Sequence, residues 1–544
     1  MQSWAILLIL CSASLVLADL QCTYFAGILR EQVNNEVREE ITHLCRLGNG
    51  QKYTLPYQLS QELSDVLISG SSRLECVGME IDEENDEIRV VSDEPLIHVL
   101  PDKKSSIYRF IDDSPTNVER SVLVVRIKSS DGRREPSYTK ERLNEVIFSD
   151  SRNVNSFAFQ YKKCSNGKLR FVPGTLEEPM GVPGVVDMVI SENFDNLHFD
   201  RAMERRVNDL FAKEIAPMNS YDHIIFCLPR NMENKFLAFA IKNDNVSYYA
   251  DPWCGKLSGT MHEIGHNLGL SHSGEWGNQE YDDESDSMGL GYNRFHGPKK
   301  CFNGQKFWYF DWFPNQKVSI TSEMLPWSGS LGAFVDVDLD EDIPVVLRVG
   351  KLYLVYNRKS KHNREVNEKA DMVTVVTADS PSSTSWMLAG LSSRSGSSST
   401  FETTTEFAGE VLTITLEVCQ MVNGNVDTSD YAEMVIRTSD QELACPSTSP
   451  SLAPLAPSPI PQTAPETEPP IFKTSPLSCV PNGSVCGTDD DCCLPTSRCS
   501  DEYTSVCEPE ANVVGGTMFS VSSGGGRGGM QRLRSNGRKL GRFR

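Results

Sequence analysis

The chain has little positive charge and almost no long apolar stretches. Its 544 residues carry 52 Lys and Arg against 74 Asp and Glu, a formal net charge of −22 at pH 7. A surface of that sign repels a polyanion, which argues against nucleic acid as a partner. After residue 18 no stretch approaches the roughly 20 apolar residues that a membrane helix requires, so we expect no membrane span.

One apolar run does occur, from Trp4 to Leu17. Val16 and Ala18 stand where small residues precede a cleavage point, so we interpret residues 1–18 as a signal peptide. No Lys or Arg precedes the run. An uncleaved anchor is the alternative, which the shortness of the run disfavours.

Cysteine usage agrees with export. All but one of the 16 cysteines lie beyond the signal peptide, too many for a reducing cytosol in a chain without an obvious cysteine-rich metal motif. N-x-S triplets at Asn245 and Asn482 fit a glycoprotein. We therefore expect a secreted, extracellular protein.

Histidine is scarce, at nine residues, yet three histidines stand at fixed intervals in the segment HEIGHNLGLSH, residues 262–272. On a helix, His262 and His266 lie on one face and can share a metal ion. Gly269 suits a helix end with positive φ, which would turn the chain back and deliver His272. Three imidazoles leave the fourth position of a tetrahedral Zn²⁺ open for water, as in a catalytic site.

Glu263 follows the first histidine and points away from the ligand pair, where it can address water at the metal. We therefore assign it as general base. The sequence H-E-x-x-H alone can arise on a solvated helix face. Three histidines and a glycine at fixed offsets are much harder to obtain by chance.

Ser287-Met288-Gly289 follows this segment after a short acidic stretch. The combination resembles the metzincin proteases, in which a methionine in a turn forms an apolar floor below the zinc ligands. By that resemblance Met288 supports the site and is no ligand. Taken alone, it would be a buried methionine.

Further segments resemble the gametolysin family of secreted metalloproteases, from about residue 120 to about residue 313. They include Lys163–Phe171, Tyr221–Ile225, Trp253-Cys254, Tyr281-Asp282 and Cys301–Asn303. The resemblance implies a zinc endopeptidase acting on extracellular matrix or cell-wall glycoproteins. It also implies a propeptide, often with a cysteine that blocks the zinc ion.

We interpret residues 19–114 as that propeptide. It contains Cys22, Cys45 and Cys76, an odd number. Cys76 is the candidate cysteine switch because Arg73 and Gly78 lie near it, although it lacks the usual Cys-Gly step. The alternative, that all three cysteines are structural, is about as good.

For residues 115–316 we predict an α/β, metzincin-like protease domain with the zinc helix behind the sheet. Strands are expected at 121–126, 157–161, 169–172 and 223–227, and helices at 138–148 and 194–216. Phe236–Ile241 is expected to be an edge strand on which a substrate peptide could add, or else an ordinary buried strand. The catalytic helix should begin near Gly255 or Ser258. The domain's cysteines, Cys164, Cys227, Cys254 and Cys301, allow three pairings.

Three other features of this domain bear on its function. The acidic run Asp282–Asp286 invites Ca²⁺ but lacks the spacing of a known calcium loop, so a solvated loop is preferred. By the resemblance, Tyr292 could support an oxyanion. His296 is expected at the surface.

The remaining chain divides into four parts. Short alternating strands, one of them at 333–337, predict a β-sandwich-like domain over 317–445, in which Cys419 and Cys445 could pair. Residues 446–478 form a Pro/Ser/Thr-rich linker. The cysteine spacing in 479–507 resembles a knottin, stabilised by disulfides. The tail 508–544 is rich in Gly and Arg and could contact an anionic matrix.

The sequence therefore predicts a secreted zinc endopeptidase made as a zymogen. Two alternatives remain. One is a catalytically silent adhesion protein that uses the fold as a scaffold, against which the intact Glu263 argues. The other is a metal-dependent hydrolase of non-peptide bonds.

Overall fold

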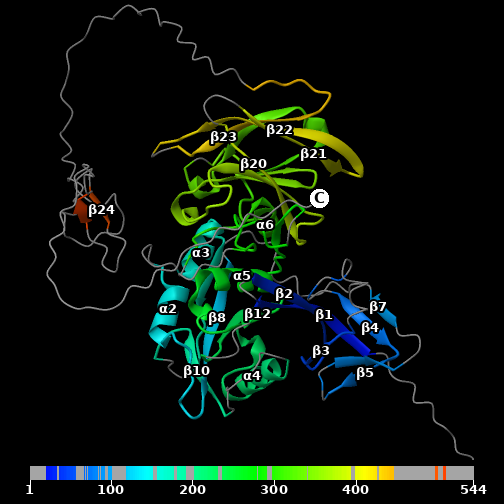
Figure 1. Cartoon of the computed structure of the whole chain (residues 1–544), viewed down its shortest axis with the longest axis vertical. Coiled ribbons are helices and arrows are strands. Elements are labelled where there is room, and N and C mark those ends of the chain that lie inside the picture. Colours follow the sequence, from blue (N-terminus) through cyan, green and yellow to red (C-terminus); the bar gives the residue numbers. More distant parts are fainter. Residues whose placement is uncertain are drawn as a thin grey trace, which may run out of the picture. The chain divides into compact units, whose positions relative to one another are not determined.

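A computed structural model gives the structure of the chain (Figure 1). It describes residues 20–33, 36–56, 67, 69, 72–83, 85, 87–91 and 96–100. It further describes 118–445, except for gaps at 151–155, 177–180, 192–200, 231–235, 278–279, 291–296, 340, 394–397 and 426–427, and finally 497–499 and 507–509. The signal peptide, the linker and most of the knottin-like module and tail expected from the sequence lie outside these residues. The chain divides into two units, Met1–Leu455 and Ala456–Arg544.

The N-terminal region is built of strands: β1 (Leu20–Val33), β2 (Glu36–Arg46), β3 (Lys52–Thr54), β4 (Arg73–Val77), β5 (Met79–Asp82), β6 (Glu87–Val90) and β7 (Leu96–Leu100). β1 and β2 form a long antiparallel hairpin, and the first residues of β1 also pair with β4. Side chains from these strands, among them Tyr24, Tyr53 and Leu74, enclose a small core. The propeptide predicted at 19–114 thus corresponds to a β-rich region with its own core.

A second region contains the predicted α/β layers. Its strands are β8 (Val118–Ser129), β9 (Leu169–Pro173), β10 (Val185–Ile190), β11 (His223–Cys227), β12 (Phe236–Ile241) and β13 (Val246–Tyr249). β8 is parallel to β9, β10 and β11, β11 is parallel to β13, and β12 is antiparallel to β13. Side chains of β8 alternate between two cores because successive residues of a strand face opposite sides.

Helices cover both faces of this sheet (Figure 1). Val122 and Val124 face a core with α2 (Lys140–Phe148), α3 (Phe157–Cys164) and α5 (Leu257–Asn267). Leu123 and Val125 face α4 (Arg201–Glu214) on the other side. The layered α/β arrangement is as expected.

The strand predicted at 157–161 is wrong, since these residues begin α3. Ser156 caps the helix, its side chain accepting the backbone N–H of Phe159. Phe157, Tyr161 and Cys164 then share the buried face, because helical neighbours lie three and four residues apart. The aromatic residues that favoured a strand are core residues of a helix.

The β-rich C-terminal region forms two sheets. One has the order β14-β20-β19-β18-β17-β15 and the other β16-β23-β22-β21. The first contains β14 (Ser273–Glu275), β15 (Lys317–Ile320), β17 (Val346–Val349), β18 (Leu352–Asn357), β19 (Met372–Thr377) and β20 (Ser385–Leu391). The second contains β16 (Trp327–Gly332), β21 (Ser399–Phe407), β22 (Glu410–Val422) and β23 (Tyr431–Thr438). The strand expected at 333–337 is wrong, because Phe334–Asp336 is a short 3₁₀ helix.

This region is not separated from the preceding one at residue 316. β14 follows His272 directly and pairs in parallel with β20, more than a hundred residues later. Helix α6 (Gly304–Phe310) contributes Phe307 to a core that also contains Leu354 of β18 and Leu257 of α5. The predicted boundary between 316 and 317 therefore runs through one continuous core.

Disulfides link Cys22–Cys45, Cys164–Cys301, Cys227–Cys254 and Cys419–Cys445. The structure thus selects one of the three pairings that the sequence left open. The described part of the second unit is a pair of short strands, β24 (Ser497–Cys499) and β25 (Cys507–Pro509). Among the described residues, no helix combines the length and apolar character needed to cross a membrane.

Candidate metal centre and active site

Helix α5 and the turn after it bring the three histidines together. α5 spans Leu257–Asn267, close to the predicted start, and buries His262 and His266 on one face. Gly269 has φ +94° and terminates the helix as expected, since only glycine adopts this conformation without a Cβ clash. The chain then turns back and places His272 beside the first two histidines.

The three imidazoles converge through their Nε2 atoms. The Nε2 atom of His266 lies 2.9 Å from Nε2 of His262 and 3.1 Å from Nε2 of His272. All three side chains are at most 2% exposed. The three imidazoles therefore form a buried cluster whose Nε2 atoms face one another.

The opposite ring nitrogens fix the tautomers. Nδ1 of His262 donates to the Ser287 carbonyl at 3.1 Å, and Nδ1 of His266 donates to the Leu270 carbonyl at 2.9 Å. Nδ1 of His272 lies 2.9 Å from Oε1 of Glu280. With each proton on Nδ1, every Nε2 presents a lone pair to the common point, and three lone pairs at this separation repel unless a cation lies among them. The donor set thus fits a divalent metal such as zinc, held by neutral imidazoles with carbonyl and carboxylate partners behind them.

Glu263, the predicted base, is 1% exposed and follows the first ligand on α5. Its carboxylate lies close enough to Tyr249 to influence that phenol: burial, and secondly the charge of Glu263, hold the pKa of Tyr249 well above its usual range. Glu263 is thus buried and adjacent along α5 to the first histidine, and its role as general base stays a prediction.

Met288 lies directly below α5. It is fully buried, and its sulfur occupies the space that a Cβ on Gly265 would need. Its neighbour Ser287 supplies the carbonyl that orients His262. The role of Gly265 was not predicted from the sequence. Because it has no side chain, Met288 can pack against α5 between His262 and His266.

The acidic run before Met288 is not the solvated loop expected from the sequence. Asp283 and Asp286 are fully buried. Asp286 accepts the backbone N–H groups of Met288 and Asn303 at 2.5 and 2.6 Å, so its carboxylate shapes the methionine turn. Burial, and next the charge of Asp286, raise the pKa of Asp283 to about 7. These carboxylates are used in structural hydrogen bonds.

Three supporting residues were not predicted from the sequence. Glu280 orients His272 and accepts the Thr384 hydroxyl at 3.0 Å. The ring of Tyr281 packs on His272 at 4.4 Å between centroids. Lys306 is buried and donates from Nζ to the His272 carbonyl at 3.0 Å. Tyr281 was noted for the resemblance alone, and nothing in the sequence linked Thr384 to a site more than a hundred residues away.

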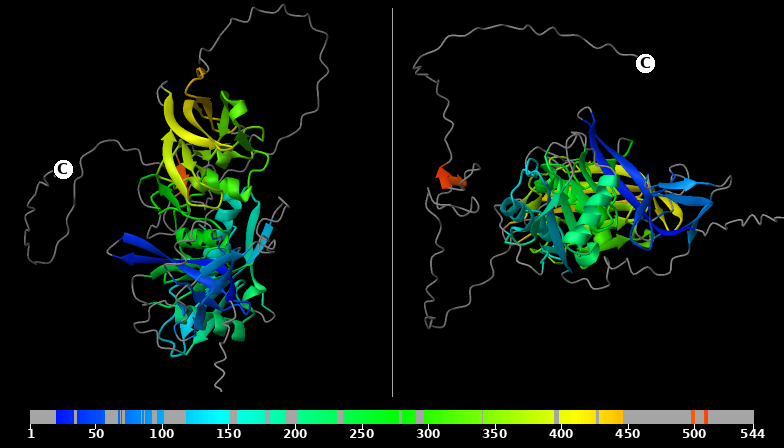
Figure 2. Two further views of the ribbon diagram at one scale, coloured as in Figure 1. Left: turned by 90° about the vertical axis from the view of Figure 1, so that its right-hand side faces the viewer. Right: turned by 90° about the horizontal axis from the view of Figure 1, so that it is seen from below.

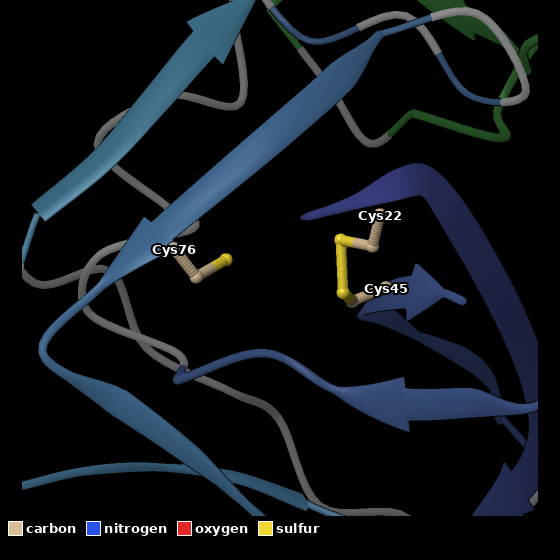
Figure 3. A group of neighbouring side chains, drawn as sticks. All are labelled: Cys22, Cys45 and Cys76. Carbon is tan, nitrogen blue, oxygen red and sulfur yellow. A yellow bond between two sulfur atoms is a disulfide. The ribbon is translucent and has the colours of Figure 1, made fainter. Parts of the chain in front are cut away.

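Cys76 does not lie with the histidines. It is buried in the N-terminal region, with its sulfur within 4.8 Å of those of Cys22 and Cys45. Figure 3 shows its side chain pointing toward the Cys22–Cys45 disulfide. Burial raises the pKa of the Cys76 thiol to about 11. In this arrangement Cys76 is a packing residue of the N-terminal core and cannot be the fourth metal ligand.

Two other residues singled out in the sequence, Tyr292 and His296, lie outside the described residues. The predicted edge strand Phe236–Ile241 is β12, which on one side pairs with β13 and on the other with β1.

The segment that carries the three histidines lies within a region that matches a known protein family. Residues 120–335 match the family model described as Gametolysin peptidase M11. No curated protein matches the chain. Among solved structures, the crystal structure of wild-type OgpA from Akkermansia muciniphila has 12% sequence identity and a TM-score of 0.25, and the match covers 60% of this chain and 99% of that chain. So low a TM-score carries no argument about the fold. The match over 120–335 includes the three histidines and Met288, and it supports a gametolysin-like metalloprotease family for this part of the chain.

Proposed function

We propose that the chain is a secreted zinc endopeptidase, made as a zymogen, that cleaves extracellular matrix or cell-wall glycoproteins. The observation that carries the proposal is the convergence of three Nε2 lone pairs beside a buried carboxylate, in a region with the sequence of a metallopeptidase. Secretion follows from the interpretation of residues 1–18 and from the cysteine content. The basic tail would add contact with an anionic matrix.

His262, His266 and His272 would hold the metal. A bound zinc ion supplies Lewis acidity and lowers the pKa of water. Glu263 takes a proton from the attacking water and returns it to the leaving amine, which makes it both general base and general acid. The carbonyls of Ser287 and Leu270 and the carboxylate of Glu280 keep the imidazoles oriented. No side-chain nucleophile is needed, since water attacks directly.

The test compares the processed chain with Glu263→Gln on a denatured protein mixture, with the zinc content of both measured. We expect the variant to keep its zinc and to lose activity by roughly 10²–10⁴-fold, the usual contribution of general acid–base catalysis. A variant that holds zinc and cleaves at the unaltered rate would remove Glu263 from the mechanism.

If neither protein cleaves after removal of residues 19–114, the peptidase proposal fails and the adhesion-protein alternative takes its place. Cleavage of an ester or amide outside peptides, with no peptide cleavage, would favour the non-peptide hydrolase.

A further inference from the structure

We propose that β1 keeps the enzyme latent by pairing with β12 and thereby occupying the sheet edge on which an extended substrate would bind. The inference rests on the proposed peptidase function and deepens it, because it assigns the means by which the N-terminal region blocks the site. In this proposal the site is blocked by a strand that pairs with the sheet edge, and not by a thiol bound to the metal.

The pairing of β1 with β12 is antiparallel and in regular register over several residues. Gly27 faces Ile241, Ile28 faces Ala240, and the pairing continues through Arg30 opposite Ala238. The other edge of β12 pairs with β13. Main-chain pairing is available to any extended peptide, so an added strand and a substrate compete for the same edge. Figures 1 and 2 show the β1–β2 hairpin running alongside the strands of the α/β sheet.

The end of β12 and the turn after it are hydrogen-bonded to the end of α5 and to the turn that carries His272. The N–H of Asn243, two residues after β12, donates to the His266 carbonyl at 3.0 Å. The Asn267 amide donates to the carbonyl of Ile241 at 2.9 Å. Nζ of Lys242 donates to the Ser271 hydroxyl, the residue before the third ligand, at 2.5 Å. A strand that pairs with β12 therefore pairs with a strand whose end is hydrogen-bonded to the elements that carry the histidines.

Ser69 forms hydrogen bonds to both segments at the end of this pairing. Ser69 accepts the N–H of Ala26 at 2.9 Å and donates to the Lys242 carbonyl at 2.5 Å. The N–H of Lys242 donates to the Ala26 carbonyl at 3.0 Å. The amide of Asn243 donates to the Ser69 carbonyl at 2.7 Å. The same short segment that follows β12 is thus held by two parts of the N-terminal region.

Apolar and ionic contacts add to these hydrogen bonds. Phe25 of β1 and Leu44 of β2 are fully buried in a core shared with Phe239 and Ile241. Lys52 forms an ion pair with Asp244 at 2.6 Å. Burial of an aromatic and an aliphatic side chain in this shared core stabilises the pairing beyond its main-chain hydrogen bonds.

The backbone groups of successive β1 residues point alternately to β12 and to β2, which allows a matched experiment. The N–H of Ala26 donates to Ser69 and its carbonyl accepts from Lys242, so both groups point toward the β12 side of β1. Because a strand alternates these groups between its two neighbours, those of Ile28 face β12 and those of Gly27 face β2. Ile28→Pro removes an N–H directed to β12, whereas Gly27→Pro removes one directed to β2.

The first experiment measures peptide cleavage by the unprocessed chain with an uncut N-terminal region. We expect Ile28→Pro to raise its activity at least about tenfold, because the edge of β12 becomes accessible. Gly27→Pro and Cys76→Ala should leave it latent. Activity released by Cys76→Ala but not by a folded Ile28→Pro would overturn the proposal in favour of a thiol switch.

The second experiment does not depend on a destabilising change. Ile28→Cys with Ala240→Cys places a cysteine pair across the two strands, and a protease site inserted into 101–117 allows the chain to be cut. We expect the cut, cross-linked enzyme to stay at least tenfold less active than the cut parent until a mild dithiol opens the cross-link.

Equal activity of the cut parent and the cut, cross-linked form would overturn the strand proposal while leaving the peptidase intact. A cut parent that cleaves no peptide would instead reject the peptidase, and the inference with it. Thermal unfolding of each variant, and the parent treated with the same dithiol, serve as controls.

Discussion

Each metal-binding imidazole is oriented by a different acceptor, and the third acceptor differs in kind. His262 and His266 donate to carbonyls, whereas His272 faces the carboxylate of Glu280, which is 38% exposed. A carboxylate behind an imidazole raises its basicity and fixes its ring plane. Glu280 in turn accepts the Thr384 hydroxyl, so the C-terminal region contacts the imidazole of His272 through the side chain of Glu280.

From this we predict that Glu280→Gln lowers zinc affinity by roughly 10–100-fold, the usual effect of losing such a partner. Thr384→Val should have a smaller effect in the same direction, because Glu280 stays but loses one hydrogen bond. Competition with a chelator of known affinity measures both. Glu275→Gln is the control, since the Glu275 carboxylate pairs with Lys369. Unaltered zinc affinity in Glu280→Gln would contradict the positioning role.

The convergence of the three histidines could be predicted from the sequence and their hydrogen-bond partners could not, for a physical reason. The three histidines lie within eleven residues, so helix geometry and one glycine determine how they meet. Glu280 belongs to a loop, and Thr384 reaches it only through the pairing of β14 with β20. No local pattern encodes such a contact.

Among the elements, strands with strong apolar runs were predicted correctly and short aromatic segments were not. β8 and β11 are buried on both faces, as their β-branched residues indicate. Residues 157–161 carry the same kind of side chains, but the Ser156 cap and packing against α5 favour a helix there. Propensity is overridden where tertiary burial suits the helical period.

An ion pair joins the N-terminal region to the segment after β12, and it makes the binding of the N-terminal region to the α/β region sensitive to acid. Burial alone would raise the pKa of Asp244, but the nearby charges of Lys52 and Arg46 outweigh it, so the pKa is lowered. A lowered pKa stabilises the docked state above the ordinary carboxyl pKa of about 3.9, and the stabilisation is lost as pH falls through the lowered value. Acid should therefore weaken docking below about pH 4.

We predict that, in the chain cut within 101–117, the N-terminal fragment dissociates more readily below this pH. Asp244→Asn should weaken binding at pH 7 by at least about tenfold, since it removes the carboxylate that pairs with Lys52 at 2.6 Å and with Arg46 at 3.8 Å, and should flatten the acid dependence. Fragment binding measured between pH 7 and pH 3 checks this. Asp222→Asn is the matched control, because Asp222 pairs with Arg120 inside the α/β region. Identical acid profiles for the parent and Asp244→Asn would refute the linkage.

At the scale of the whole molecule, residues 118–445 behave as one folding unit rather than as a protease with an appended β-domain. β14 starts one residue after the third ligand and completes a sheet whose other strands lie at 317–391. The sequence showed where strands become frequent, and this suggested a boundary. It could not show that the first strand of that sheet comes from the metal-binding segment itself.

A chain ending at residue 445 should therefore fold and bind zinc like the full protein, whereas a chain ending at 316 should do neither. Truncation at 316 exposes apolar side chains such as Phe307 and removes the partner strand of β14. Soluble yield, cooperative thermal unfolding and zinc content distinguish the two. A chain ending at 316 with the same unfolding temperature and zinc content would restore the predicted boundary.

The disulfides set how activation would proceed after a cut. Among the described residues, Cys22–Cys45 lies wholly within the N-terminal region, and the other bonds lie wholly within 164–445. As far as the described disulfides go, a single cut in 101–117 would thus leave two pieces joined by non-covalent contacts alone. Activity would then follow mass action: a concentrated, freshly cut enzyme stays largely silent, and dilution into the surroundings releases it.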